Sequence, residues 1–129
     1  MRRRYDLAIA AAATIIGFGL HIWNHLFDAT DFSAGFLLWS MAPYLLALGL
    51  LAPASRFVLA GAVVAILGSD LFTHISVHVW PTSSTAGLNY LFMPFWNSVI
   101  FLPGGAFIGW IIGEIFGEPR PLHRSRRFD

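Results

Sequence analysis

Long runs of apolar residues, separated by short polar stretches, dominate this chain. Four runs are long enough to cross a bilayer as helices, which takes about 20 mostly apolar residues. They cover about 6–27, 34–52, 57–80 and 88–116. Only helices and closed barrels satisfy every backbone polar group inside lipid. The pattern therefore predicts an all-α fold, a polytopic four-helix transmembrane bundle that forms a single domain over residues 1–129.

The fourth run differs from the others because it exceeds one straight crossing and contains Pro94 and Pro103. Proline removes a backbone donor and bends or ends a helix. We therefore expect the fourth helix to be kinked or broken. The broken form would be a short outer helix at about 84–93, followed by a span that starts near residue 95.

The positions of the arginines predict the orientation. All eight basic residues are arginines, and they lie before the first span, in the second loop and after the fourth span. In a four-span protein these positions share one side, which the positive-inside rule makes cytoplasmic. We expect both termini in the cytoplasm of a protein of the bacterial inner membrane, with a short basic tail at 118–129. The arginines at 2–4 and the first apolar run resemble a signal peptide, but the run is long enough to span and lacks a clear cleavage site.

Composition narrows the possible functions. The chain is 57% hydrophobic and only 12% charged, with no cysteine and a net charge of +1. The lack of cysteine excludes disulfides, thiolate metal sites and iron–sulfur clusters. The small net charge gives no reason to expect nucleic acid, so the expected partner is the lipid bilayer. Paired catalytic carboxylates and Ser/His/Asp sets are not visible, and the sequence leaves open whether the protein is an enzyme.

Two histidine pairs are the strongest candidates for a functional site. His21 and His25 lie on the first span, and His74 and His78 lie on the third. Each pair is spaced i,i+4, which places both rings on one face of a helix. Measured back from the loops, His25 matches His78 in depth and His21 matches His74. Because ionisable side chains inside a membrane are costly, they indicate a functional site.

Metal or cofactor binding is the leading hypothesis for these histidines. Neutral imidazole is a good ligand for Cu, Zn and Fe, and two helices could close a site of three or four histidines. Asp70, Asp28 and Asn24 lie on neighbouring positions. Asp70 or Asp28 could bind the metal directly, or accept the second ring N–H of a ligating histidine and fix its orientation, and Asn24 is a further candidate for such a supporting contact. A redox or metal-handling role would follow from such a site. Haem is an alternative, with axial ligands from His21 and His74, and chlorophyll-type pigment is another.

A proton or ion pathway is a different reading of the same residues. Chains of Asp and His inside membranes commonly form proton relays. Asp70, His74 and His78 make one polar stripe along an otherwise apolar helix. The stripe could lead protons inward from the outer face. Few polar residues could continue this path across the membrane; the candidates are Ser40, Ser69, Asn97, Ser98 and Glu114.

A glycine repeat on the fourth span suggests a third role. Gly105, Gly109, Gly113 and Gly117 recur every four residues. Small residues at this spacing form a flat stripe that another helix can approach closely. The stripe could pack within the bundle or against a second copy. The protein could therefore be a homo-oligomer, or a structural or accessory subunit of a larger membrane complex, including one that holds pigment or haem.

Overall fold

The computed structural model describes residues 5–27, 34–53, 55–80 and 88–116, and these residues form helices or the turns beside them. The first three helices are α1 (Tyr5–Phe27), α2 (Ala34–Leu51) and α3 (Arg56–His78). The rest consists of α4 (Asn89–Trp96), the π-helical segment η3 (Asn97–Phe101) and α5 (Leu102–Phe116). The protein is thus all-helical over the described residues, with four helices long and apolar enough to span a membrane. The predicted spans agree closely with these bounds.

The fourth span is continuous in its helical backbone from Asn89 to Phe116. Its middle contains the π-helical segment η3, in which backbone hydrogen bonds join residues five positions apart. The backbone N–H of Leu102 donates to the carbonyl of Asn97. Such π-bulges within α-helices often occur at functional sites. Pro94 lies inside α4. A kink at either proline stays a prediction.

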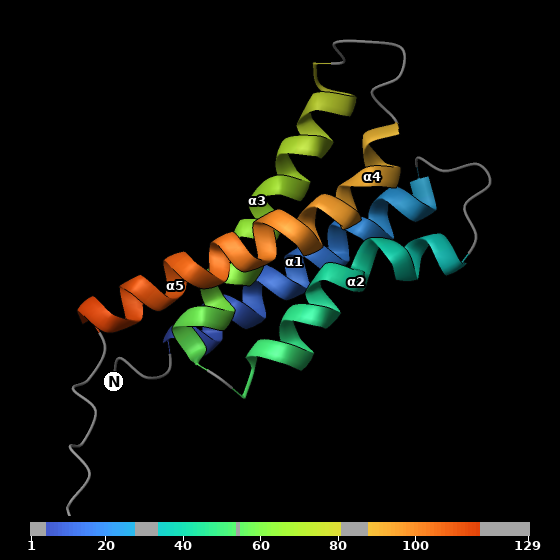
Figure 1. Cartoon of the computed structure of the whole chain (residues 1–129). Coiled ribbons are helices and arrows are strands. Elements are labelled where there is room, and N and C mark those ends of the chain that lie inside the picture. Colours follow the sequence, from blue (N-terminus) through green and yellow to red (C-terminus); the bar gives the residue numbers. More distant parts are fainter. Residues whose placement is uncertain (1–4, 28–33, 54, 81–87, 117–129) are drawn as a thin grey trace, which may run out of the picture.

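Helix α3 lies at the centre of the arrangement, in contact with α1, α2 and the fourth span. Figure 1 shows the start of α1 and the end of α5 at the same end of the bundle, as an even number of spans requires. We call this the arginine end, because Arg56 at the start of α3 also lies there. The opposite end, where α1 and α3 finish, is called the histidine end. That the arginine end faces the cytoplasm stays a prediction.

The closest helix pair is α3 with α5, and glycine makes it possible. A Cβ added to Gly61 of α3 would overlap the carbonyl oxygen of Gly105, and one added to Gly109 would overlap the carbonyl oxygen of Phe57. Gly113 is less tight, since its Cβ would meet the Phe57 side chain at 3.3 Å. Three glycines of the predicted stripe therefore lie against α3 of the same chain. Gly117 lies outside the described residues.

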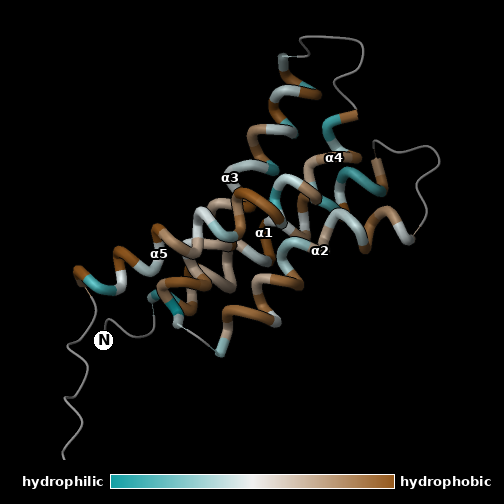
Figure 2. The backbone as a smooth tube through the Cα atoms, in the orientation of Figure 1, coloured by the Kyte–Doolittle hydropathy of each residue, from teal (hydrophilic) through white to brown (hydrophobic). Residues whose placement is uncertain are grey.

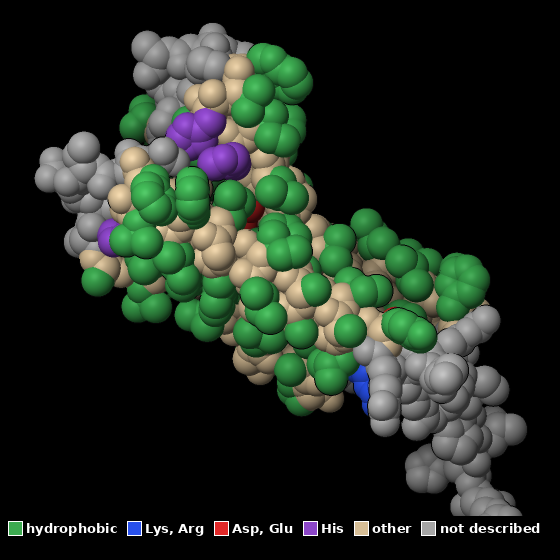
Figure 3. Space-filling view, turned by 180° about the vertical axis from the view of Figure 1, so that it is seen from behind, with side chains coloured by type: hydrophobic (Ala, Val, Ile, Leu, Met, Phe, Trp, Pro, Cys, Tyr) green, Lys and Arg blue, Asp and Glu red, His purple; other side chains and the backbone are tan. Residues whose placement is uncertain are grey.

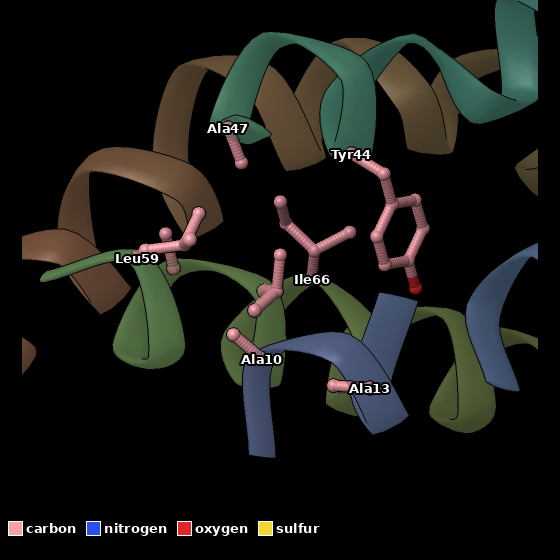
Figure 4. Packing of buried hydrophobic residues seen from close by; sticks show 8 residues of the cluster. Ala10, Ala13, Tyr44, Ala47, Leu59 and Ile66 are labelled. Carbon is pink, nitrogen blue, oxygen red and sulfur yellow. The ribbon is translucent and has the colours of Figure 1, made fainter. Parts of the chain in front are cut away.

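The apolar core occupies the half of the bundle nearer the arginine end. Figure 4 shows small side chains of α1 and α2 meeting branched side chains of α3. The buried hydrophobic residues are Ala10, Ala13, Tyr44, Ala47, Leu59, Ala62, Val63 and Ile66. Alanine and glycine let the helices approach closely, so packing is dense although few large side chains take part.

The outside of the bundle is covered by large apolar side chains. Ile15, Leu50, Phe72 and Ile115 are all exposed, and they come from different spans. Figure 3 shows hydrophobic side chains spread over the surface seen in that view. Soluble monomers rarely expose apolar area on this scale. The distribution is typical of helices that face lipid.

Candidate functional site

A buried carboxylate joins all four spans. Asp70 of α3 is only 4% exposed and accepts hydrogen bonds from three other helices. The Tyr44 hydroxyl of α2 donates to Oδ2 at 2.7 Å, and Asn97 Nδ2 of η3 donates to Oδ1 at 2.7 Å. His21 Nε2 of α1 lies 3.1 Å from Oδ2. Sharing a single acceptor group fixes how the four spans are rotated against one another.

The charge on Asp70 is matched by the donors around it. An ionised Asp70 only accepts hydrogen bonds, and in that state the Nε2–H of His21 is the donor of this contact. Burying a charge is costly unless it is paired and hydrogen-bonded. With a second proton on its ring, His21 would form an ion pair with Asp70.

Tyr44 reaches Asp70 because α1 leaves room for its ring. A Cβ on Gly17 would overlap the Tyr44 side chain at its hydroxyl end. The rings of Phe18 and His21 pack edge-on against Tyr44, with centroids 5.8 and 6.0 Å away. A buried tyrosine needs a partner for its hydroxyl. The ring is thereby held in a slot on α1 that aims the hydroxyl at Asp70.

Asn97 reaches Asp70 from the first residue of the π-helical segment. Its side chain is 1% exposed, and its Oδ1 has no hydrogen-bond partner among the described residues. Each widened turn shifts the residues that follow it around the helix axis. Asn97 is therefore fixed where the fourth span changes its twist, in contact with the centre of the bundle.

A small cavity lies beside Asp70 on the side of the histidine end. It offers about 10 Å³ to the centre of a water-sized sphere. Its lining is Leu20, His21, Asn24, Ser40, Asp70, Thr73, Tyr90, Met93 and Pro94. Most of these side chains carry polar atoms. Asn24 stands out because both its amide atoms are buried with no hydrogen-bond partner in the described part of the chain.

The second histidine pair forms an aromatic cluster nearer the histidine end. The rings of His74 and His78 have centroids 4.5 Å apart, as the i,i+4 spacing predicts. The Tyr90 hydroxyl of α4 lies 3.1 Å from His74 Nδ1. Tyr90 also lines the cavity, so it joins this cluster to the Asp70 site. Figure 3 shows neighbouring histidine side chains at the surface, with a small area of carboxylate below them.

The structure brings the predicted site residues together in a different way from a four-histidine site. His21 pairs with Asp70, whereas His74 pairs with Tyr90. His25 has a buried Nδ1 without a partner among the residues described, and Asp28 lies outside them. No group of three or more His, Cys, Asp or Glu side chains in the described ranges is placed to hold a metal ion. Metal binding by His21, His25, His74 and His78 stays a prediction.

Tyr44 and Tyr90 are site residues that the sequence analysis missed. A signal was present, because Tyr44 lies in the middle of an apolar span, where its hydroxyl must find a partner. Asp70 lies at a similar distance from the same end of the bundle. Asn97 was recognised only as a polar residue of a sparse pathway, and nothing in the sequence connects it to Asp70.

Figure 2 shows that hydrophilic residues recur where α1, α3 and α4 approach the histidine end, whereas the helix middles are mainly apolar. Six buried polar side chains of the described residues lie toward this end: His21, Ser40, Ser69, Asp70, Thr73 and Asn97.

Comparisons with models of protein families, with curated proteins and with solved structures find no match for this chain. Function has to be inferred from the chemistry of the site.

Proposed function

We propose that the protein takes up protons at its histidine end and passes them into the membrane to Asp70, as part of a proton pathway. One observation carries this proposal. A buried carboxylate is bound to a histidine and lies beside a small cavity, whose lining includes the tyrosine that contacts a second histidine. Ionisable residues inside membranes commonly mark such relays.

The proposed route has three steps. His78 and His74, near the histidine end, exchange protons with water. The Tyr90 hydroxyl lies 3.1 Å from His74 and can pass a proton on, because it both donates and accepts. The cavity then leads to His21 and Asp70, which share a hydrogen bond. Every group along this route can hold and release a proton.

Beyond Asp70 the route meets the apolar core. Ile66, Ala62 and Val63 of α3 are fully buried, and Ala10 and Ala47 pack around them. A proton on Asp70 can therefore return only to the histidine end in this arrangement. Passage to the arginine end requires the helices to repack, and we place this movement in the fourth span, with its two prolines and its π-helical segment. The kink expected from the sequence would serve as the hinge.

Proton flux into liposomes tests the proposal. Purified protein is reconstituted with a pH-sensitive dye inside, and a potassium gradient with valinomycin drives protons inward. Wild type should acidify the lumen faster than empty liposomes, and Asp70→Asn should abolish the difference because the amide cannot take up a proton. Asp6→Asn is the matched control, since it makes the same change at a partly exposed carboxylate in the first turn of α1, outside the proposed route. Equal flux in wild type and Asp70→Asn would contradict the proposal.

Metal binding is a second proposal, favoured by the adjacent rings of His74 and His78. Their centroids are 4.5 Å apart, and the Tyr90 oxygen lies beside them, so the cluster offers two nitrogen donors and one oxygen donor. Cu, Zn and Fe all accept such ligands. Elemental analysis of mildly purified protein should then find stoichiometric metal that His74→Ala removes. A Soret or pigment band in the same sample would point to haem or chlorophyll. A sample that contains neither metal nor chromophore would contradict the proposal.

A further inference from the structure

We infer that the cavity between Asp70 and Tyr90 is a binding site for one water molecule. The inference concerns the ligand of this site, and its functional meaning rests on the proposed proton route. The water would join the His74–Tyr90 contact to the His21–Asp70 pair, two groups that the side chains alone leave separated by the cavity.

The size of the cavity fits a single water. A cavity needs roughly 10–15 Å³ of space for the centre of a water-sized sphere to hold one molecule. The space here is about 10 Å³, the size of one water. A buried water also needs two to four polar partners. Side chains of α1, α2, α3 and α4 contribute polar atoms to this lining, including Asn24, Ser40, Thr73 and Tyr90.

The unpartnered amide of Asn24 identifies the kind of ligand. Both Nδ2 and Oδ1 are buried without a hydrogen-bond partner in the described ranges. An unsatisfied buried polar group is costly, so a native structure rarely leaves two on one side chain. Asn24 needs a partner that can accept from its nitrogen and donate to its oxygen. Water does both.

A small cation fits the same lining less well. It would satisfy Asn24 Oδ1 but would repel the amide hydrogens of Nδ2 on the same side chain. Asp70 also has little to offer a cation, because its oxygens already accept from Tyr44, Asn97 and His21. Ser40 has donated its proton to the carbonyl of Phe36, and its oxygen is left as an acceptor for a donor such as water.

Radiolytic labelling of the reconstituted protein tests the inference directly. Brief X-ray irradiation turns bound water into hydroxyl radicals, which oxidise neighbouring methionine to its sulfoxide. Met93 lines the cavity, whereas Met41 of α2 is also partly buried and does not line it. With a water in place, mass spectrometry should find Met93 oxidised several-fold faster than Met41. Equal rates in the wild type would overturn the inference.

Two variants separate cavity water from water that reaches Met93 by another path. Asn24→Leu places an apolar side chain in the cavity and should lower Met93 oxidation to the rate of Met41. Thr73→Val keeps the shape of a buried cavity residue but removes its hydroxyl, and should lower the rate in the same direction. An unchanged rate of Met93 oxidation in the folded variants would overturn the inference. A fall in the wild-type rate of Met93 oxidation on addition of sodium or lithium would also overturn it, because a cation would then occupy the site.

The outcome is independent of the flux experiment. If Asp70→Asn abolishes flux but Met93 and Met41 react equally, the proton route stands and the bound water fails. If Met93 is labelled in a protein that carries no flux, the water is a structural ligand and the proposed function fails.

Discussion

The two halves of this bundle are held together by different forces. Toward the arginine end, α3 and α5 approach until glycine backbones touch, and the buried side chains are almost all apolar. Toward the histidine end, the spans are joined through hydrogen bonds to Asp70. Lipid is as apolar as leucine, so burial alone does not drive helices together in a membrane. Close packing supplies the attraction in one half, and polar contacts supply it in the other.

This difference also separates stability from function. A close-packed apolar half leaves little room for water or protons. Among the described residues, the polar half contains buried polar atoms of Asn24, His25 and Asn97 that have no hydrogen-bond partner, which a purely structural core would avoid. We therefore expect substitutions in the first half to affect folding, and those in the second half to affect transfer to Asp70.

The largest effect on stability is expected from Gly109→Leu. A side chain at this position collides with the carbonyl of Phe57, so α5 must move away from α3. Overpacking of this kind costs about 3 kcal/mol. Thermal unfolding in detergent, followed by circular dichroism, should show a clearly lower midpoint. Gly104→Leu on the same helix is the control, since no atom lies within 4 Å of its added Cβ. Equal destabilisation by both variants would contradict the packing argument.

Gly17→Ala should come next, because it connects the two halves. The added methyl group occupies the place of the Tyr44 ring, which must then withdraw its hydroxyl from Asp70. We expect a loss of about 2 kcal/mol in the free energy of unfolding. Gly19→Ala adds the same methyl group to α1 where there is open space. It should be neutral or slightly stabilising, and a neutral result at Gly17 would show that the ring position is not fixed.

Tyr44→Phe removes only the hydroxyl. The loss of one interhelical hydrogen bond inside a membrane should cost about 1 kcal/mol. Flux should change more than stability, because Asp70 loses the donor that lies 2.7 Å from its Oδ2. Chemical unfolding and liposome flux measured on the same preparation give both numbers. Tyr5→Phe, at an exposed position, controls for the loss of a hydroxyl. Unchanged flux together with unchanged stability would mean that the contact with Asp70 is of no consequence.

The smallest effect on stability is expected from His74→Ala. His74 is only partly buried, and its loss should cost less than about 1 kcal/mol. Its effect on proton flux should nevertheless be large, because the Tyr90 hydroxyl loses its contact with an imidazole. His25→Ala tests the four-histidine metal site predicted from the sequence, because neither the proton route nor the cluster of His74, His78 and Tyr90 uses His25. Loss of bound metal without loss of flux would favour the four-histidine site.

The spans could be predicted from the sequence because the requirement is local. A helix that crosses lipid must be apolar along its whole length, and this shows in the order of the residues. The candidate site could be predicted only in part. The polar stripe of Asp70, His74 and His78 follows from helical spacing alone, and their importance follows from the cost of ionisable groups in lipid.

The partners of these residues depended on tertiary structure. Every face of these helices is largely apolar, so hydropathy does not reveal how each helix is rotated or which helices are neighbours. The rotation is set by contacts between residues far apart in the chain, such as Gly61 with Gly105. It decided that His21 meets Asp70 rather than a second histidine, and that Tyr44 belongs to the site. The sequence alone determined which segments can cross the membrane and which polar residues they carry, because both are properties of single helices; the packing of the helices decided which of those residues meet.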